Sequence, residues 1–223
     1  MITVLYFWNI ERSNIPQAIL RMALDRRLLK KNEKIFFFKL LGTGKGETFT
    51  PRDANSLRWG LLVTMKSEHL ELFDHGSVAN HWRKIATSEY RAILRPLSSH
   101  GQWSMREPFV VEEFKWDGPV AAITRARIKW RHNFRFWKAV PPITQALHEA
   151  PGLRSAIGIG EAPIGLQGTF STWNSAADVR AFAYKSSAHL AAIDQTKELG
   201  WYAEELFARF AIIEESGSLS PLA

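Results

Sequence analysis

The alternation of hydrophobic and polar positions in the first hundred residues predicts strands and helices in a regular order. Residues 2–8 are mostly β-branched and aromatic, which favours a strand. Apolar positions then recur at helical spacing up to residue 31, with Pro16 in the first turn. A helical region at residues 67–88, broken at Gly76, follows later. Further strands are predicted at residues 34–41, 59–65 and 90–97.

The same order returns in the second half of the chain, after a connecting loop at residues 99–118. Helices are predicted at residues 134–149, despite two prolines, and from Ser175 onward, where Asp178 completes an approximate capping box. Residues 214–223 are expected to form a disordered tail. Strands are predicted at residues 120–130, 154–159, 166–173 and 202–213.

Short segments of the two halves match each other. Each half has the order βαββαβ, the ferredoxin-like unit, whose sheet leaves one face uncovered. We predict an α+β fold in which residues 1–98 and 119–213 form two tandem ferredoxin-like repeats, packed as a pseudo-dimeric α+β barrel. The matches are Leu41-Gly42-Thr43-Gly44 with Ile157-Gly158-Ile159-Gly160, residues 64–67 with residues 172–175, and His81 with His189.

Composition narrows the class of protein. Hydrophobic residues make up 46% and charged residues 23% of the 223 positions, which is typical of a soluble globular protein with a core. The sequence has no run of about 18 apolar residues, so no membrane span is predicted. The apolar N-terminus lacks the basic leader of a signal peptide. The absence of Cys excludes disulfides, thiolate metal ligands and cysteine nucleophiles, and it is compatible with the cytoplasm.

The net charge is +7, from 29 basic and 22 acidic residues. The basic residues are dispersed, apart from a cluster at the end of the first helix, where cations suit the helix dipole, and the stretch at residues 125–138. That stretch begins with the alternation of a half-buried strand. We therefore expect no nucleic-acid partner, while peripheral membrane association stays open.

The chain carries none of the common short motifs for phosphate, metal or serine chemistry. Glycines at residues 42–46 fit neither GxxxxGK[ST] nor GxGxxG before a helix, so a hairpin loop is expected there. None of the seven His forms an HExxH or similar close pair. There is no GxSxG elbow, although a Ser-His-Asp triad from distant positions stays open.

His189 is the first candidate for chemistry. In a helix it lies seven positions after Phe182 and four before Ile193, so it shares their buried face. A buried imidazole needs a hydrogen-bond partner or a metal, and a single histidine facing an apolar cavity is what a five-coordinate haem requires. On spacing alone, a hydrogen-bonded core histidine is the favoured interpretation of this residue.

Aromatic residues and arginines supply candidate ligand contacts. Trp137, Phe170 and Trp173 are predicted to line a pocket for a flat or polyene ligand, or else to fill the space between sheets. Arg125 and Arg209 lie in mainly apolar strands, where a buried guanidinium needs a carboxylate partner. The partner is either a ligand carboxylate, such as a haem propionate, or a carboxylate of the chain, from Glu161, Glu204 or Glu205.

Five collinear segments carry a more specific pattern. They are FKLLGTGKGETFTP (38–51), GPVAAITRARI (118–128), RFWKAVPPI (135–143), IGIGEAP (157–163) and GWYAEELFARF (200–210). Together they resemble the spheroidene monooxygenase family, the carotenoid ketolases of purple-bacterial pigment synthesis. The resemblance implies a haem-containing oxygenase that introduces oxo groups at the end of an acyclic carotenoid, with electrons from a donor such as ferredoxin. It also implies a fold similar to dimeric α+β barrel haem proteins, among them chlorite dismutase and aldoxime dehydratase.

The resemblance also implies roles for single residues. It makes His189, in the second half, the axial ligand of the haem iron. The other implicated residues line the haem pocket or serve a propionate or bound oxygen: Trp137, Phe170 and Trp173 for the wall, Arg209 for the cofactor, and Arg125 and Arg135 for catalysis.

Other functions stay open on the same scaffold. They are a haem enzyme of the aldoxime dehydratase or peroxidase type, a cofactor-free monooxygenase, and a cofactor-free ligand-binding barrel. The expected partners are a hydrophobic small molecule and an electron donor such as ferredoxin, with a homodimer left open. The expected location is cytoplasmic, with or without peripheral contact with a membrane.

Overall fold

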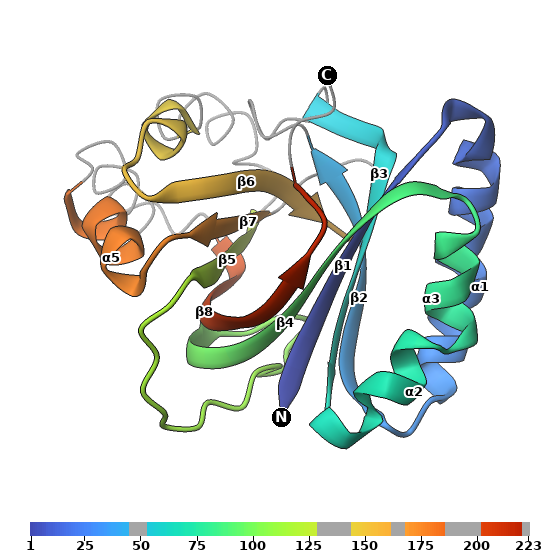
Figure 1. Cartoon of the computed structure of the whole chain (residues 1–223), viewed down its shortest axis with the longest axis horizontal. Coiled ribbons are helices and arrows are strands. Elements are labelled where there is room, and N and C mark those ends of the chain that lie inside the picture. The colour runs from blue at the N-terminus through green and yellow to red at the C-terminus, as the bar shows by residue number, and fades with distance from the viewer. Residues whose placement is uncertain (45–52, 129–143, 162–167, 186–201, 220–223) are drawn as a thin grey trace.

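The computed structural model describes residues 1–44, 53–128, 144–161, 168–185 and 202–219. Within them, eight strands close into a barrel in the order β1-β3-β2-β6-β7-β5-β8-β4 (Figure 1). The strands are β1 (Ile2–Ile10), β2 (Ile35–Gly44), β3 (Ala54–Met65), β4 (Ala86–Gly101), β5 (Val120–Ile128), β6 (Leu153–Gly160), β7 (Gly168–Trp173) and β8 (Tyr202–Ser216). The labelled α-helices are α1 (Ile15–Lys31), α2 (Leu70–Asp74), α3 (Ser77–Arg83) and α5 (Ala176–Lys185). The predicted α+β barrel of two ferredoxin-like units is confirmed.

Each half contributes four strands in the same order, β4-β1-β3-β2 in the first half and β8-β5-β7-β6 in the second. The halves join where β2 pairs with β6 and where β4 pairs with β8. At the first junction Thr43 lies opposite Ile159, and Gly42 lies opposite Gly160. The matching segments of the repeat therefore meet each other, as approximate two-fold symmetry requires. The hairpin loop expected from Gly42 onward is wrong for residues 42–44, because they are strand residues of this junction.

Strand β8 is longer than the hydrophobic pattern predicts. It continues to Ser216, and residues 214–216 pair with residues 91–93 of β4. Glu215 also accepts a hydrogen bond from the Tyr90 hydroxyl at 3.1 Å and forms an ion pair with Arg154. The disordered tail expected from residue 214 is therefore wrong for these residues. Their polar side chains resemble a solvated tail, but their backbone completes the ladder with β4.

The connecting loop between β4 and β5 covers one end of the barrel. Its Trp103 and Phe109 side chains are buried in the barrel core, and the Phe109 ring meets Phe210 edge to face at 4.8 Å. Phe37 of β2 contacts both loop aromatics. Apolar side chains from all eight strands fill the interior, so the barrel encloses a packed core.

Helices α1, α2 and α3 cover the outer face of the first half's sheet, and α5 lies against the second half, on the other side of the barrel (Figure 1). The predicted break at Gly76 is confirmed, because it separates α2 from α3. The capping box of α5 is confirmed too, since Ser175 Oγ accepts the Asp178 N–H at 3.2 Å. No helix in the described ranges is long and apolar enough to cross a bilayer.

Candidate functional site

The two halves carry side chains of different size on the outer faces of their sheets. Strand register fixes which positions correspond, because Thr64 of β3 matches Thr172 of β7 in the repeat. In the first half the central outer positions are Val4, Tyr6, Phe38, Leu40, Leu61 and Val63, which pack under α1 and α3. In the second half the corresponding positions are Ala122, Thr124, Ala156, Gly158, Thr169 and Ser171. We call this second set the small-residue face; its side chains project less far from the sheet than those of the packed first half.

Aromatic and aliphatic side chains close one end of the small-residue face. Trp173 of β7 packs on Phe182 of α5, with ring centroids 5.5 Å apart, and its indole Nε1 donates to Ser171 Oγ at 2.9 Å. Val179 of α5 and Leu147, in a short helix at residues 144–148, belong to the same cluster. The face therefore has a floor of small residues, with α5 beside it and an apolar wall at one end.

Arg209 borders the small-residue face on β8. It lies directly opposite Ala122, and its guanidinium Nε donates to Ser98 Oγ at 2.9 Å. The corresponding position of the first half is Ile93, which lies opposite Val4. The second half therefore has a cation where the first half has an apolar side chain. A guanidinium at the edge of a face of small residues is suited to an anionic ligand group such as a carboxylate.

Phe170 and Trp173 do not line one pocket. They are three residues apart on β7, and alternate residues of a strand point to opposite faces. Phe170 points into the barrel, where its ring packs on those of Phe7 and Tyr90, with ring centroids 5.8 Å and 6.4 Å apart. Only Trp173 of the pair contacts the small-residue face.

Arg125 also points into the barrel and is paired there by carboxylates of the chain. The side chain is 4% exposed, and its guanidinium donates to Glu204 at 2.5 Å and to Glu161 at 3.1 Å. Glu161 further accepts from Lys39 at 2.5 Å and from the Trp103 indole at 2.6 Å. The expectation that Glu161 or Glu204 pairs an inward arginine is confirmed. Both terminal nitrogens of the guanidinium are therefore paired, Nη1 with Glu204 and Nη2 with Glu161. Arg125 lies on the opposite side of the sheet from the small-residue face.

The carboxylates of this cluster are held ionised. Burial raises the pKa of Glu161, but hydrogen bonds from Lys39 and Trp103 and the charge of Arg125 outweigh burial and lower that pKa below its usual value. Burial also raises the pKa of Glu204, but its hydrogen bonds have the larger effect, so the pKa of Glu204 is lower than its usual value. Backbone N–H groups of the 104–105 turn donate to Glu204 at 3.1 and 2.8 Å, so Glu204 also anchors the connecting loop.

We expect the protein to lose stability as the pH falls through the acid range. The pKa of each glutamate is lower in the folded state than in the unfolded chain, so the unfolded state binds more protons and stability rises with pH. The stabilisation is present above about pH 4.5 and is lost as the pH falls through the lower folded values. Urea unfolding between about pH 6 and 3 measures this slope. Glu204→Gln should flatten it, whereas the exposed-site control Glu113→Gln should not.

Three predicted site residues, Arg135, Trp137 and His189, lie outside the described residues. The counterpart of His189 in the repeat, His81, lies on α3 with its Nδ1 3.1 Å from Arg21. In the described part of the chain, no three His, Asp or Glu side chains lie close enough to hold one metal ion. Sequence reasoning missed the small-residue face, although the match of residue 64 with residue 172 already set Val63 against Ser171.

Comparison with known proteins identifies the family. No protein-family model matches the chain. The spheroidene monooxygenase of Rhodobacter capsulatus is 38% identical over 214 residues, which cover 92% of this chain and 87% of that protein. The spheroidene monooxygenase of Rubrivivax gelatinosus is 34% identical over 183 residues, covering 81% and 70%. The crystal structure of an aldoxime dehydratase in complex with butyraldoxime shares the fold, with a TM-score of 0.57, 11% identity and coverage of 96% of this chain and 79% of that one. The chain belongs to the spheroidene monooxygenase family.

Proposed function

We propose that this protein is a haem-dependent monooxygenase that oxidises a hydrophobic, carotenoid-like substrate. The haem lies on the small-residue face of the second half, with His189 as its axial ligand. The observation that carries the proposal is the difference between the two outer sheet faces, one filled by Tyr6, Phe38 and Leu40 and the other floored by Thr124, Ala156 and Gly158. The family membership supports the reaction and the class of substrate.

The described residues fit a haem. A flat macrocycle needs a floor without projecting side chains, and a Cβ substituent larger than those of Ala156 or Ser171 would enter that space. The propionates of a haem need cations, and Arg209 lies at the border of the face. Trp173 and Phe182 supply an apolar wall. His189 lies four positions beyond Lys185, the last described residue of α5, in the helix that the hydrophobic pattern predicts.

When bound, a haem would supply dioxygen activation: with two electrons from an external donor and two protons from solvent, one oxygen atom is inserted into a substrate C–H bond and the other leaves as water. The chain's own contribution is binding and exclusion of water. The apolar wall at Trp173 excludes solvent and accepts an apolar polyene, while Arg209 orients the cofactor through a charged hydrogen bond. We assign Arg125 to the stability of the barrel, because Glu161 and Glu204 already pair it.

The test is incorporation of oxygen from isotopically labelled dioxygen. Haem-loaded protein, reduced by a ferredoxin system, is given spheroidene in detergent, and the first hydroxylated product is analysed by mass spectrometry. The proposal expects one labelled atom per hydroxyl and no product from haem-free protein. Equal turnover by haem-free protein would identify a cofactor-free monooxygenase instead. Product oxygen that comes only from labelled water would contradict oxygenation altogether.

A further inference from the structure

Helix α1 carries a stripe of leucines on its outer face. Leu20, Leu24 and Leu28 recur every four residues and are 51%, 38% and 45% exposed. The opposite face, with Ala18 and Leu29, packs on the sheet. A surface helix ordinarily turns its apolar residues toward the core and keeps its outer face polar. A contiguous apolar stripe facing solvent is typical of a surface that contacts a protein or a membrane.

The exposed charges of α1 itself all have one sign. The exposed charged residues of α1 are Arg26, Arg27, Lys30 and Lys31. The single carboxylate of the helix, Asp25, is fully buried beneath it, 3.7 Å from Arg21. The nearest glutamates in the sequence, Glu11 and Glu33, lie outside the helix. The outer face therefore combines leucines with cations and presents no anion within the helix.

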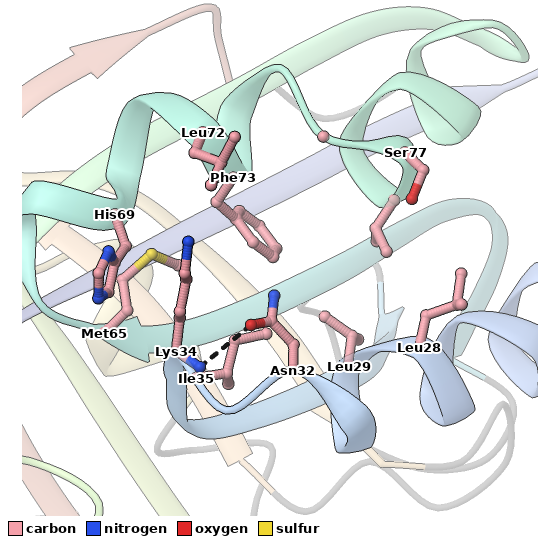
Figure 2. A pocket seen from close by; sticks show the side chains of 12 residues that line it. Leu28, Leu29, Asn32, Lys34, Ile35, Met65, His69, Leu72, Phe73 and Ser77 are labelled. Atoms are coloured by element: carbon pink, nitrogen blue, oxygen red, sulfur yellow. Dashed lines mark hydrogen bonds between the residues drawn. The ribbon is translucent and has the colours of Figure 1, made fainter.

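A groove continues the apolar surface beyond Leu28. It has a volume of about 320 Å³ and lies between the C-terminal end of α1 and helix α2 (Figure 2). Figure 2 shows Lys34 and His69 together at one end of the groove. Leu72 of α2, which also lines the groove, is 63% exposed. The remaining apolar lining consists of Leu29, Ile35, Met65, Phe73 and Val78. The groove thus offers an apolar channel with a cation at its rim, next to the leucine stripe.

The charges on the outer face of α1 indicate which kind of partner binds there. A two-fold contact with a second copy would bring two sets of like charges into one interface and leave all of them without anionic partners on α1. An anionic partner suits the face better. Leucines interleaved with Lys and Arg along one helix are the pattern of helices that lie in the interface of anionic bilayers.

We propose that the outer face of α1, with the adjoining groove, docks the protein on the surface of an anionic phospholipid bilayer. Leu20, Leu24 and Leu28 enter the headgroup–acyl boundary, the cations contact lipid phosphates, and the groove receives an alkyl chain. In Figure 1, α1 lies on the opposite side of the barrel from α5, so docking leaves the small-residue face uncovered. The inference needs no haem, and its test is independent of the oxygenation experiment.

Vesicle flotation tests the docking surface. Purified full-length protein should bind vesicles with about 30% phosphatidylglycerol at least about tenfold more tightly than pure phosphatidylcholine, and should dissociate in about 0.5 M salt. Leu24→Asp with Leu28→Asp should weaken binding about tenfold or more, and Arg27→Glu with Lys31→Glu should do the same. Matched controls lie on the connecting loop: Val110→Asp with Val111→Asp, and Arg106→Glu with Lys115→Glu, all at exposed positions. Circular dichroism verifies that each variant is folded.

Two outcomes would overturn the proposal. One is equal loss of binding in the loop controls and the α1 variants, which would reduce the effect to net charge. The other is wild-type vesicle binding by the α1 variants. If those variants lose a dimer observed by sedimentation velocity, or lose an acidic protein partner, while their vesicle binding is unchanged, α1 is a protein interface and not a membrane surface.

Discussion

Filling the small-residue face with the residues of the first half should abolish haem binding without unfolding the barrel. The variant is Ala156→Phe with Ser171→Val, which places at these positions the residues found at Phe38 and Val63. Side chains that close the space over the floor exclude a flat cofactor, and we expect haem affinity to fall about a hundredfold or more. Ser171→Val also removes the acceptor of the buried Trp173 Nε1–H, so we expect stability to fall by about 1–3 kcal/mol, which leaves the barrel folded. Haem titration and urea unfolding measure the two effects.

The reverse exchange is the matched control. Phe38→Ala with Val63→Ser removes side chains from the packed face under α1 and α3, and we expect a loss of about 2–4 kcal/mol of stability. Haem affinity in this variant should equal that of the wild type, because the change lies in the other half. Wild-type haem affinity in the filled variant of the second half would contradict the assignment of the cofactor to that face.

Replacing Arg125 by Met should destabilise the protein by about 1–3 kcal/mol, because it removes charged hydrogen bonds to Glu204 and to the partly exposed Glu161. Glu204, which is 10% exposed, loses its guanidinium contact, and Glu161 keeps only Lys39 and Trp103. Adding Glu204→Gln to Arg125→Met should recover part of the loss, since the uncompensated charge is then removed. Urea unfolding at neutral pH measures the cycle.

Arg127→Met is the matched control for this cycle. Arg127 lies two residues further along β5 and is exposed, so its replacement should change stability by about 0.5 kcal/mol or less. The result that contradicts a stabilising role is an Arg125→Met variant of wild-type stability that has lost turnover. Arg125 would then be the catalytic residue that the family resemblance implies.

The architecture could be predicted because each half has to bury one face of its sheet. The repeat indicated that two such units pack on each other to do so. The match of Leu41–Gly44 with residues 157–160 led to two units, and in the barrel these segments pair across the β2–β6 junction. The partners of Arg125 followed from the cost of burying an unpaired guanidinium. Local patterns were sufficient in these cases because a buried sheet face needs an apolar cover, and a buried guanidinium needs a carboxylate, in any fold.

Features that depend on strand pairing could not be predicted from local patterns. The small-residue face becomes visible only when register shows that Ala122, Ser171 and Ala156 lie side by side. The extension of β8 depends on β4, which supplies hydrogen-bond partners for a polar segment. The burial of Trp103 has no periodic signal, because it comes from an irregular loop that closes the barrel end. The opposite orientation of Phe170 and Trp173, by contrast, was readable from their odd spacing.

The absorption spectrum of the protein during haem titration, beside that of the His189→Ala variant, tests directly whether the protein binds haem through His189. We expect a Soret band that saturates at one haem per chain in the parent and is lost or shifted in the variant, whose far-ultraviolet circular dichroism matches the parent. The same spectrum in both proteins would remove His189 as the ligand. The absence of a Soret band in the parent after haem is supplied would contradict a haem-dependent monooxygenase, and the barrel would then be a cofactor-free scaffold.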